Sequence, residues 1–163
     1  MAHALKSWLT DSGSLTYRLK RQYPDFFVFP LRLKNAKALL DETALLGLKA
    51  SQYVCNREVL LMGGHQPLVF AHSILPKKSL RGAWIKLGKL DNKPLGAALF
   101  ANPKVVRAPL RFKKLSPHQA LYQKATEHLT NKPAYLWARR SVFSLNHANI
   151  LVTEVFLQQI LLP

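Results

Sequence analysis

The chain has 163 residues, of which 48% are hydrophobic, so it can form a single domain with a substantial core. Its one cysteine, Cys55, excludes an internal disulfide and is typical of proteins from a reducing compartment. The formal net charge of +16 predicts attraction to anions, but the basic residues are spread along the chain rather than concentrated as in nucleic-acid-binding segments.

Signals for export or membrane insertion are not apparent in the sequence. Residues 1–8 lack the basic region followed by an apolar stretch that marks a signal peptide. No apolar run approaches the roughly 18 residues of a membrane-spanning helix. We therefore expect a cytoplasmic protein, and we take a monomer as the starting expectation.

The first half of the chain predicts two short helices followed by three strands. Ser14 can cap the second helix, and Pro24 ends it. Pro30 removes a hydrogen-bond donor from the first strand, which places that strand at an edge or a bulge of a sheet. The segment 35–47 is ambiguous, and the glycines within 63–67 predict a hairpin between the second and third strands. The expected helices span 2–9 and 15–22, and the expected strands span 26–33, 51–62 and 68–75.

The second half predicts one clear helix among three more strands. This helix covers 116–129, with Ser116 as its cap and Pro117 at its first position. Shorter helical turns are expected at 79–88 and 94–100, and a turn at 146–149 joins the last two strands. These strands span 105–112, 134–145 and 150–157. Because strands joined by tight hairpins pair antiparallel, we predict an α+β fold with a mostly antiparallel sheet and helices packed on one face.

Three of the predicted strands carry one ionisable side chain each in an otherwise apolar row. Side chains alternate between the two faces of a strand, so Glu154 shares a face with Ile150, Val152 and Phe156. By the same count Arg57 and His72 also lie on apolar faces. A charge in such a place is costly unless it meets an opposite charge, a hydrogen-bond partner or a ligand, so the set predicts a ligand site.

Structural explanations of the same residues stay open. Arg57 and Glu154 could form a buried ion pair that only fixes the register of the strands, and His72 could be a core histidine with its hydrogen bonds satisfied. The sequence contains no metal-ligand spacing, phosphate-binding loop or G-x-S-x-G elbow. One guanidinium and one carboxylate suit a small anionic substrate, with Arg57 holding a carboxylate and Glu154 handling a proton at an oxygen.

The residues around these positions resemble the chorismate lyase family. The segment Arg57-Glu-Val-Leu-Leu, with its glycine-containing hairpin and the strand ending at Pro76, looks like the family's R-E-I-L-L segment and its partner strand. The segments 87–89 and 93–96 look like its L-G-K-T-P-L-G. Arg139-Arg-Ser141 and 151–157, Leu-Val-Thr-Glu-Val-Phe-Leu, are similar to its last two strands. The segments follow the family order and cover most of the chain.

The resemblance implies a single chorismate-lyase-like domain over 1–163, with a six-stranded antiparallel sheet and a small closed pocket. It implies a lyase that converts chorismate to 4-hydroxybenzoate and pyruvate for ubiquinone biosynthesis, without a metal or an organic cofactor. Carried over by position, Arg57 binds the ring carboxylate together with the backbone N–H of Leu95. Glu154 faces the oxygen at the opposite end of the ring, and Leu15 contacts the ligand from a covering helix.

Two departures from the family pattern affect this expectation. His72 stands where the family has a second arginine, which is expected to help hold the pyruvyl carboxylate, so His72 becomes a candidate substrate-binding residue. Lys89 or Arg140 could replace the missing cation. Three extra residues also separate Lys89 from Pro94, so a loop near the site differs in length.

Two other functions compete with the lyase. A small-ligand-sensing module of the transcription-regulator type is expected to share this fold, but only about 25 residues precede the first strand, too few for a DNA-binding domain. A basic nucleic-acid-binding protein is argued from charge alone and lacks an aromatic-rich basic strand, so we expect no nucleic acid as a partner. The basic surface also suggests a weak association with anionic membrane surfaces.

Overall fold

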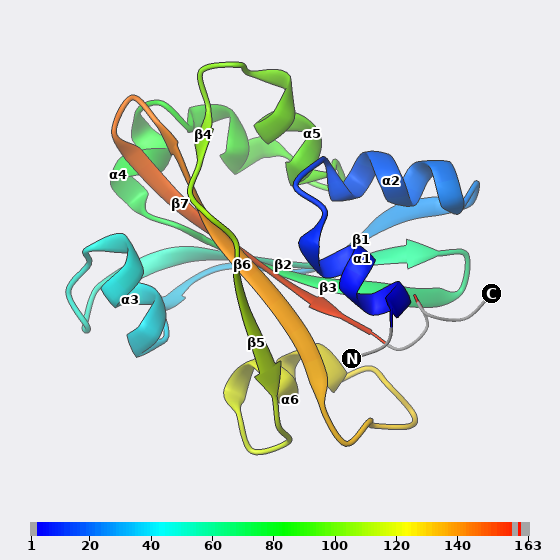
Figure 1. Cartoon of the computed structure of the whole chain (residues 1–163). Coiled ribbons are helices and arrows are strands. Elements are labelled where there is room, and N and C mark those ends of the chain that lie inside the picture. Colours follow the sequence, from blue (N-terminus) through cyan, green and yellow to red (C-terminus); the bar gives the residue numbers. More distant parts are fainter. Residues whose placement is uncertain (1–2, 158–159, 161–163) are drawn as a thin grey trace.

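The computed structural model describes residues 3–157 and residue 160, and these residues form a seven-stranded antiparallel sheet with helices around it (Figure 1). The strand order is β1-β2-β3-β7-β6-β4, and β5 also pairs with β6. The strands are β1 (Phe26–Lys37), β2 (Tyr53–Gly63), β3 (Gln66–Leu75), β4 (Val106–Arg107), β5 (Arg111–Leu115), β6 (Leu136–Leu145) and β7 (Ala148–Phe156).

The helices are short and lie on both faces of the sheet. One face is covered by α1, α2 and α5, which pack on residues such as Val59, Val69 and Val152; we call it the site face. The opposite face is covered by α3 and α6, which pack on Leu60, Phe70 and Leu151 among others. The helices are α1 (His3–Thr10), α2 (Leu15–Gln22), α3 (Leu40–Leu46), α4 (Lys77–Arg81), the 3₁₀ helix η1 (Ile85–Lys89), α5 (Leu95–Ala101) and α6 (Ala120–Thr126).

Several predicted elements are confirmed in detail. Helix α2 has the predicted bounds, and the Ser14 side chain accepts a hydrogen bond from the backbone N–H of Tyr17. Strand β1 lies at the edge of the sheet, and its register shifts between Pro30 and Arg32, as the proline predicts. The turn between β6 and β7 places Asn146 and His147 at positive φ, as a two-residue hairpin requires.

The antiparallel α+β fold is confirmed, with three differences from the expectation. The predicted strand 105–112 is two strands, because Pro109 cannot donate to the ladder between them, so the sheet has seven strands. The last predicted helix begins at Ala120 rather than after Ser116, with Gln119 at the cap position. Helices cover both faces because β2, β3 and β7 carry apolar side chains on both sides, and each side must be buried.

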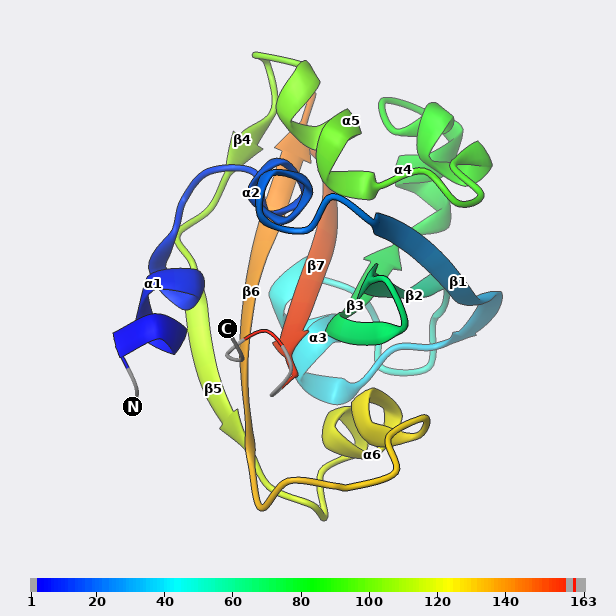
Figure 2. The same ribbon diagram turned by 90° about the vertical axis from the view of Figure 1, so that its right-hand side faces the viewer.

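One end of the site face is covered by two helices that touch each other. Helices α2 and α5 lie side by side over the same end of β6 and β7 (Figure 2). Gly96 permits this contact, since a Cβ at that position would lie 2.9 Å from Oγ1 of Thr16. The two helices therefore form a fitted cover over the strands that carry Glu154 and its neighbours. Among the described helices, none is long and apolar enough to cross a membrane.

Candidate functional site

Four of the five predicted site residues surround one small cavity beneath α2 and α5. Arg57 comes from β2, Glu154 from β7, Leu15 from α2 and Leu95 from α5. The cavity measures about 40 Å³, which is room for a few water molecules but not for a six-membered ring. Ligand binding here therefore requires the covering helices to move. Other lining residues include Thr16, Val59, Ser73, Arg107, Arg139 and Val152.

Arg57 is a buried cation without an acidic partner in the part of the chain that the structure describes. The residue is 5% exposed, and its Nη2 donates hydrogen bonds to the carbonyl oxygens of Asp91, at 3.3 Å, and Lys93, at 2.8 Å. No carboxylate of the described chain lies within 4.0 Å of its guanidinium. Burial lowers the pKa of Arg57, but an arginine remains charged at neutral pH. A desolvated, uncompensated cation at a cavity wall is suited to binding an anion.

Glu154 pairs with a different arginine. Its Oε2 accepts a hydrogen bond of 2.6 Å from Nε of Arg139, the residue directly opposite it on β6. The open alternative of a direct Arg57–Glu154 ion pair is therefore wrong. Arg139 is 1% exposed, and its Nη1 donates to the carbonyl oxygens of Trp8, Leu9 and Asp11 at and beyond the end of α1. The pair links Glu154 to the N-terminal helix and fixes its side chain.

A third arginine lies beside this pair. Arg107 donates from Nε to Oγ of Ser141 at 2.9 Å and from Nη1 to the carbonyl oxygen of Ser12 at 3.1 Å. Burial is the largest influence on its pKa and lowers it; nearby Glu154 acts in the opposite direction. The cavity wall thus contains three guanidinium groups and one carboxylate, which is an electrostatic environment for an anionic ligand.

His72 is buried as predicted, but it lies on the opposite face of the sheet. Its Nδ1 donates to Glu58 at 2.7 Å and its Nε2 donates to Glu42 of α3 at 2.8 Å. Burial acts to lower the pKa of His72, but the two carboxylates outweigh it and raise this pKa to about 9. The prediction that His72 contacts the ligand of the cavity is not supported, and the alternative of a hydrogen-bonded core histidine describes it.

A one-residue register shift separates His72 from Arg57. The hairpin pairs Gly63 with Gln66 and Met62 with Pro67, and a regular ladder continuing from there would set Arg57 opposite His72. The register shifts by one residue between Leu61 and Met62, so Arg57 pairs with Ser73 instead. A single inserted residue moves every following side chain to the other face.

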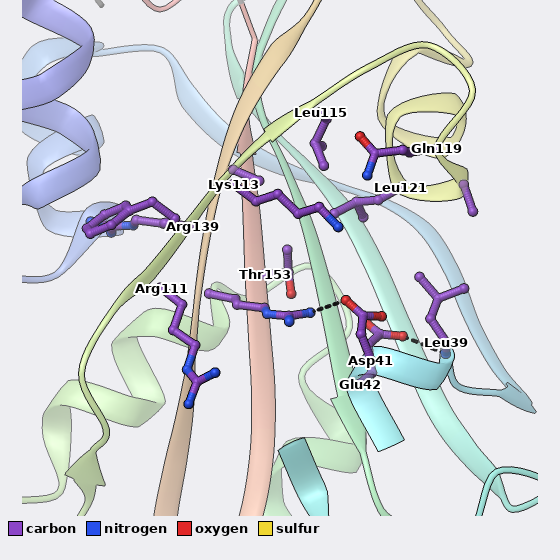
Figure 3. Close-up of a pocket in the computed structure, with 14 residues that line it drawn as sticks. Leu39, Asp41, Glu42, Arg111, Lys113, Leu115, Gln119, Leu121, Arg139 and Thr153 are labelled. Atoms are coloured by element: carbon purple, nitrogen blue, oxygen red, sulfur yellow. Dashed lines mark hydrogen bonds and ion pairs between the residues drawn. The ribbon is translucent and has the colours of Figure 1, made fainter. Parts of the chain in front are cut away.

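A larger cavity on the opposite face does not contain the predicted residues. It measures about 480 Å³ and lies between β5, β6 and the α3 and α6 helices. Figure 3 shows Thr153 near its centre and the side chain of Arg139 directed away from it. Arg140, which also lines this cavity, forms an ion pair of 2.6 Å with Asp41. Because Arg57 and Glu154 are both absent from its wall, we place the candidate site in the smaller cavity despite its size.

Arg107 and Arg139 are functional candidates that the sequence reasoning missed. Arg139 could have been found, because a two-residue turn at Asn146 and His147 fixes a register in which Arg139 faces Glu154. Arg107 had no such signal, since β4 has only two residues and reaches the site through tertiary contacts. Within the described chain, no three His, Cys, Asp or Glu side chains are grouped to hold a metal ion.

Comparison with solved structures shows what the fold resembles. A GntR-family transcriptional regulator from Bacillus cereus superposes with a TM-score of 0.60 at 13% identity, covering 83% of this chain and 93% of the other. The effector domain of PhnF from Mycobacterium smegmatis gives 0.61 at 13% identity, covering 88% of each chain. At these identities the likeness concerns the fold alone.

Sequence comparison is far more specific. The family model described as chorismate lyase matches residues 1–162. A probable chorismate pyruvate-lyase from Nitrosomonas europaea is 48% identical over 94% of this chain and 86% of its own length. Those from Nitrosospira multiformis and Thiobacillus denitrificans are 46% and 45% identical, over 96% and 98% of this chain and 87% and 85% of their own lengths. The chain therefore belongs to the chorismate lyase family.

Proposed function

We propose that this protein is a chorismate lyase, which converts chorismate to 4-hydroxybenzoate and pyruvate. The observation that carries the proposal is the buried, uncompensated charge of Arg57, which faces the same small cavity as Glu154. A planar ring with a carboxylate at one end and an oxygen at the other suits these two groups. The membership in the chorismate lyase family supports the same substrate.

The four predicted residues at the cavity hold different parts of the substrate in this proposal. Arg57 anchors the ring carboxylate, and this carboxylate replaces the water that the buried guanidinium has lost. The backbone N–H of Leu95, the first residue of α5, is not used within the helix and donates to the same carboxylate. Leu15 covers the ring from α2, and the apolar wall formed by residues such as Val59 and Val152 excludes water.

Glu154 is proposed as the acid–base group at the far end of the ring. In the reaction the bond between the ring carbon and the enolpyruvyl oxygen breaks, and its electron pair leaves with that oxygen. A neighbouring ring carbon loses its proton, the electrons of that C–H bond complete the aromatic ring, and the released enolpyruvate takes up a proton to become pyruvate. Glu154, held by Arg139, can assist this proton transfer, while the cavity orients the dianion.

The reaction is tested directly by mixing the purified chain with chorismate. We expect 4-hydroxybenzoate, followed by its absorbance, and pyruvate, measured separately, to appear in equal amounts. Binding of 4-hydroxybenzoate without turnover of chorismate would instead favour a ligand-sensing module, which the regulator-like fold makes the second candidate. A salt-sensitive complex with RNA and no product would contradict both.

Location and assembly are further parts of the proposal. We propose a cytoplasmic monomer whose basic surface, with a net charge of +16, associates weakly with anionic membranes. The motive is that 4-hydroxybenzoate is used by a membrane-bound enzyme in the ubiquinone pathway. Flotation with vesicles containing anionic lipid tests this; no salt-dependent recovery with the vesicles would contradict it.

A further inference from the structure

Arg139 has one buried donor nitrogen without a partner among the described residues. Its Nε donates to Glu154 and its Nη1 to three carbonyl oxygens, but Nη2 meets no hydrogen-bond acceptor of residues 3–157 or 160, although the atom is buried. A buried, unsatisfied donor is uncommon and costs free energy, more so on a charged group. An incomplete set of hydrogen bonds at a cavity wall therefore indicates a place for a ligand atom.

The position of this nitrogen on the guanidinium shows where that ligand atom would lie. The Nε–H and one N–H of Nη2 point along the same edge of the group, and this edge normally receives both oxygens of a carboxylate. Glu154 occupies only the Nε half of the edge. The Nη2 half, beside Glu154, has no hydrogen-bond partner among the described residues, and both residues line the cavity.

The charges of the cavity wall suit a dianion. Arg57, Arg107 and Arg139 against Glu154 leave two positive charges in excess. Arg57 lies two strands away from Glu154 in the sheet, with β3 between them, so the cations are divided between two ends of the cavity. Arg57 can hold one carboxylate, and Arg139 with Arg107 can hold a second.

We propose that Nη2 of Arg139, supported by Arg107, forms a second carboxylate subsite, which binds the enolpyruvyl carboxylate of the substrate. This inference rests on the proposed lyase function for the identity of the ligand. Arg139 supplies, on the site face, the cation that His72 cannot provide from the opposite face. The same arginine positions Glu154 through Nε, so one side chain aligns the leaving group with the acid–base group.

A second carboxylate subsite would contact the substrate but not the aromatic product. Chorismate carries two carboxylates, whereas 4-hydroxybenzoate carries only the ring carboxylate assigned to Arg57. Loss of the Nη2 donor should therefore weaken binding of dicarboxylates and leave monocarboxylate binding nearly intact. A purely structural role of Arg139, through the carbonyl oxygens at the end of α1, would weaken both equally by loosening the cavity.

The experiment compares Arg139→Gln with Arg139→Lys and a matched control, Arg18→Gln. Arg18 also ties down the N-terminal helix, through the carbonyl oxygen of Ser7 and the side chain of Asp11, but it does not line the cavity. For each protein we would measure the melting temperature, the KM and kcat for chorismate, and the Kd for two unreactive probes. The probes are 4-hydroxybenzoate and 3-(1-carboxyvinyloxy)benzoate, an aromatic analogue with both carboxylates.

In Arg139→Gln we expect the affinity for the dicarboxylate probe and kcat/KM to fall by about 10- to 100-fold, the range for a hydrogen bond to a charged group. The Kd for 4-hydroxybenzoate should change less than about threefold. Arg139→Lys should recover part of the loss, and Arg18→Gln should show none of it. Equal losses for both probes, or the same pattern in Arg18→Gln, would overturn the subsite.

The two proposals fail differently in this design. If the wild-type chain releases no product from chorismate, but Arg139→Gln still loses the preference for the dicarboxylate probe, the subsite stands and the lyase function fails. If chorismate turns over and the preference is unchanged in Arg139→Gln, the lyase function stands and the subsite fails. Should Arg139→Gln not fold, Arg139→Lys and Arg107→Lys give the same comparison of probes.

Discussion

Glu154 and Arg139 are directly opposite residues of the β6–β7 hairpin, joined by a hydrogen bond of 2.6 Å between Oε2 and Nε. Arg57, on the other side of the same cavity, has only backbone carbonyl oxygens as hydrogen-bond partners within the described chain. The charge of Glu154 is therefore compensated by an arginine, whereas the charge of Arg57 meets no carboxylate of the described chain. This asymmetry leads to different outcomes for substitutions at the two ends.

Arg57→Met should weaken binding without destabilising the fold. Removing a hydrogen-bonded cation that faces a ligand carboxylate should lower the affinity for 4-hydroxybenzoate by about 10- to 100-fold, measured by isothermal titration. Because the cation has no acidic partner, its removal should leave the ligand-free melting temperature unchanged or higher. Unchanged affinity would mean that the ring carboxylate is bound elsewhere.

The His72 network predicts a pH dependence of stability. The folded-state pKa of about 9 lies above the ordinary value of 6.5, so this stabilisation is complete below about pH 6.5 and is lost as the pH rises through 9. Burial tends to raise the pKa of Glu58, but the hydrogen bonds from His72 and Arg32 outweigh burial and lower it to about 2. Thermal denaturation from pH 6 to 10 should show a falling melting temperature.

Two substitutions test this network. His72→Ala leaves Glu42 and Glu58 buried without their shared partner and should cost about 3–5 kcal/mol in free energy of unfolding. His72→Arg, which introduces the residue of the family pattern, keeps a cation that does not titrate, so its stability should not decline between pH 7 and 9. The same decline in His72→Arg as in the wild type would assign the effect to other groups.

Gly96 tests the cover over the cavity. A Cβ at Gly96 would lie 2.9 Å from Oγ1 of Thr16, whereas a Cβ at Gly88 would meet no atom within 4 Å. Gly96→Ala should therefore push α2 and α5 apart and raise the rate of product dissociation by several-fold, on the order of 1 kcal/mol. Gly88→Ala is the matched control and should release product at the wild-type rate.

Opening of this cover is expected to limit turnover. The cavity of about 40 Å³ lies beneath α2 and α5 and is too small for the aromatic product, so we expect the product to leave only after these helices move. Rapid mixing with excess chorismate should show a burst of one 4-hydroxybenzoate per chain, followed by a slower steady rate. Gly96→Ala should reduce the burst by accelerating the steady phase; a linear first turnover in the wild type would place the slow step before release.

Local sequence signals predicted most of the fold. The Ser14 cap, the proline in β1 and the hairpin at 63–67 each correspond to a feature of the structure. The alternation of apolar side chains was sufficient to identify Arg57 and Glu154 as candidates, and both residues line the same cavity. The family resemblance added Leu15 and Leu95, which no local pattern in α2 or α5 would have selected.

The rest depended on interactions that alternation cannot reveal. The prediction that His72 faces the site was not supported, because a strand with apolar side chains on both sides does not show which side faces the site. The register shift between Leu61 and Met62 also has no signal in the sequence. The break at Pro109 was overlooked although the proline is visible. The carbonyl oxygens that hold Arg139 come from residues about 130 positions away, beyond any local pattern.

One pair of substitutions tests most directly whether Glu154 transfers a proton during the reaction. Glu154→Gln keeps the size of the side chain and an acceptor for Arg139 but removes the ability to transfer a proton. We predict that it lowers kcat for chorismate by about 100-fold or more, while the Kd for 4-hydroxybenzoate changes by less than about tenfold. Glu127→Gln, at an exposed carboxylate outside the cavity, should retain wild-type turnover. Wild-type kcat in Glu154→Gln would contradict the account.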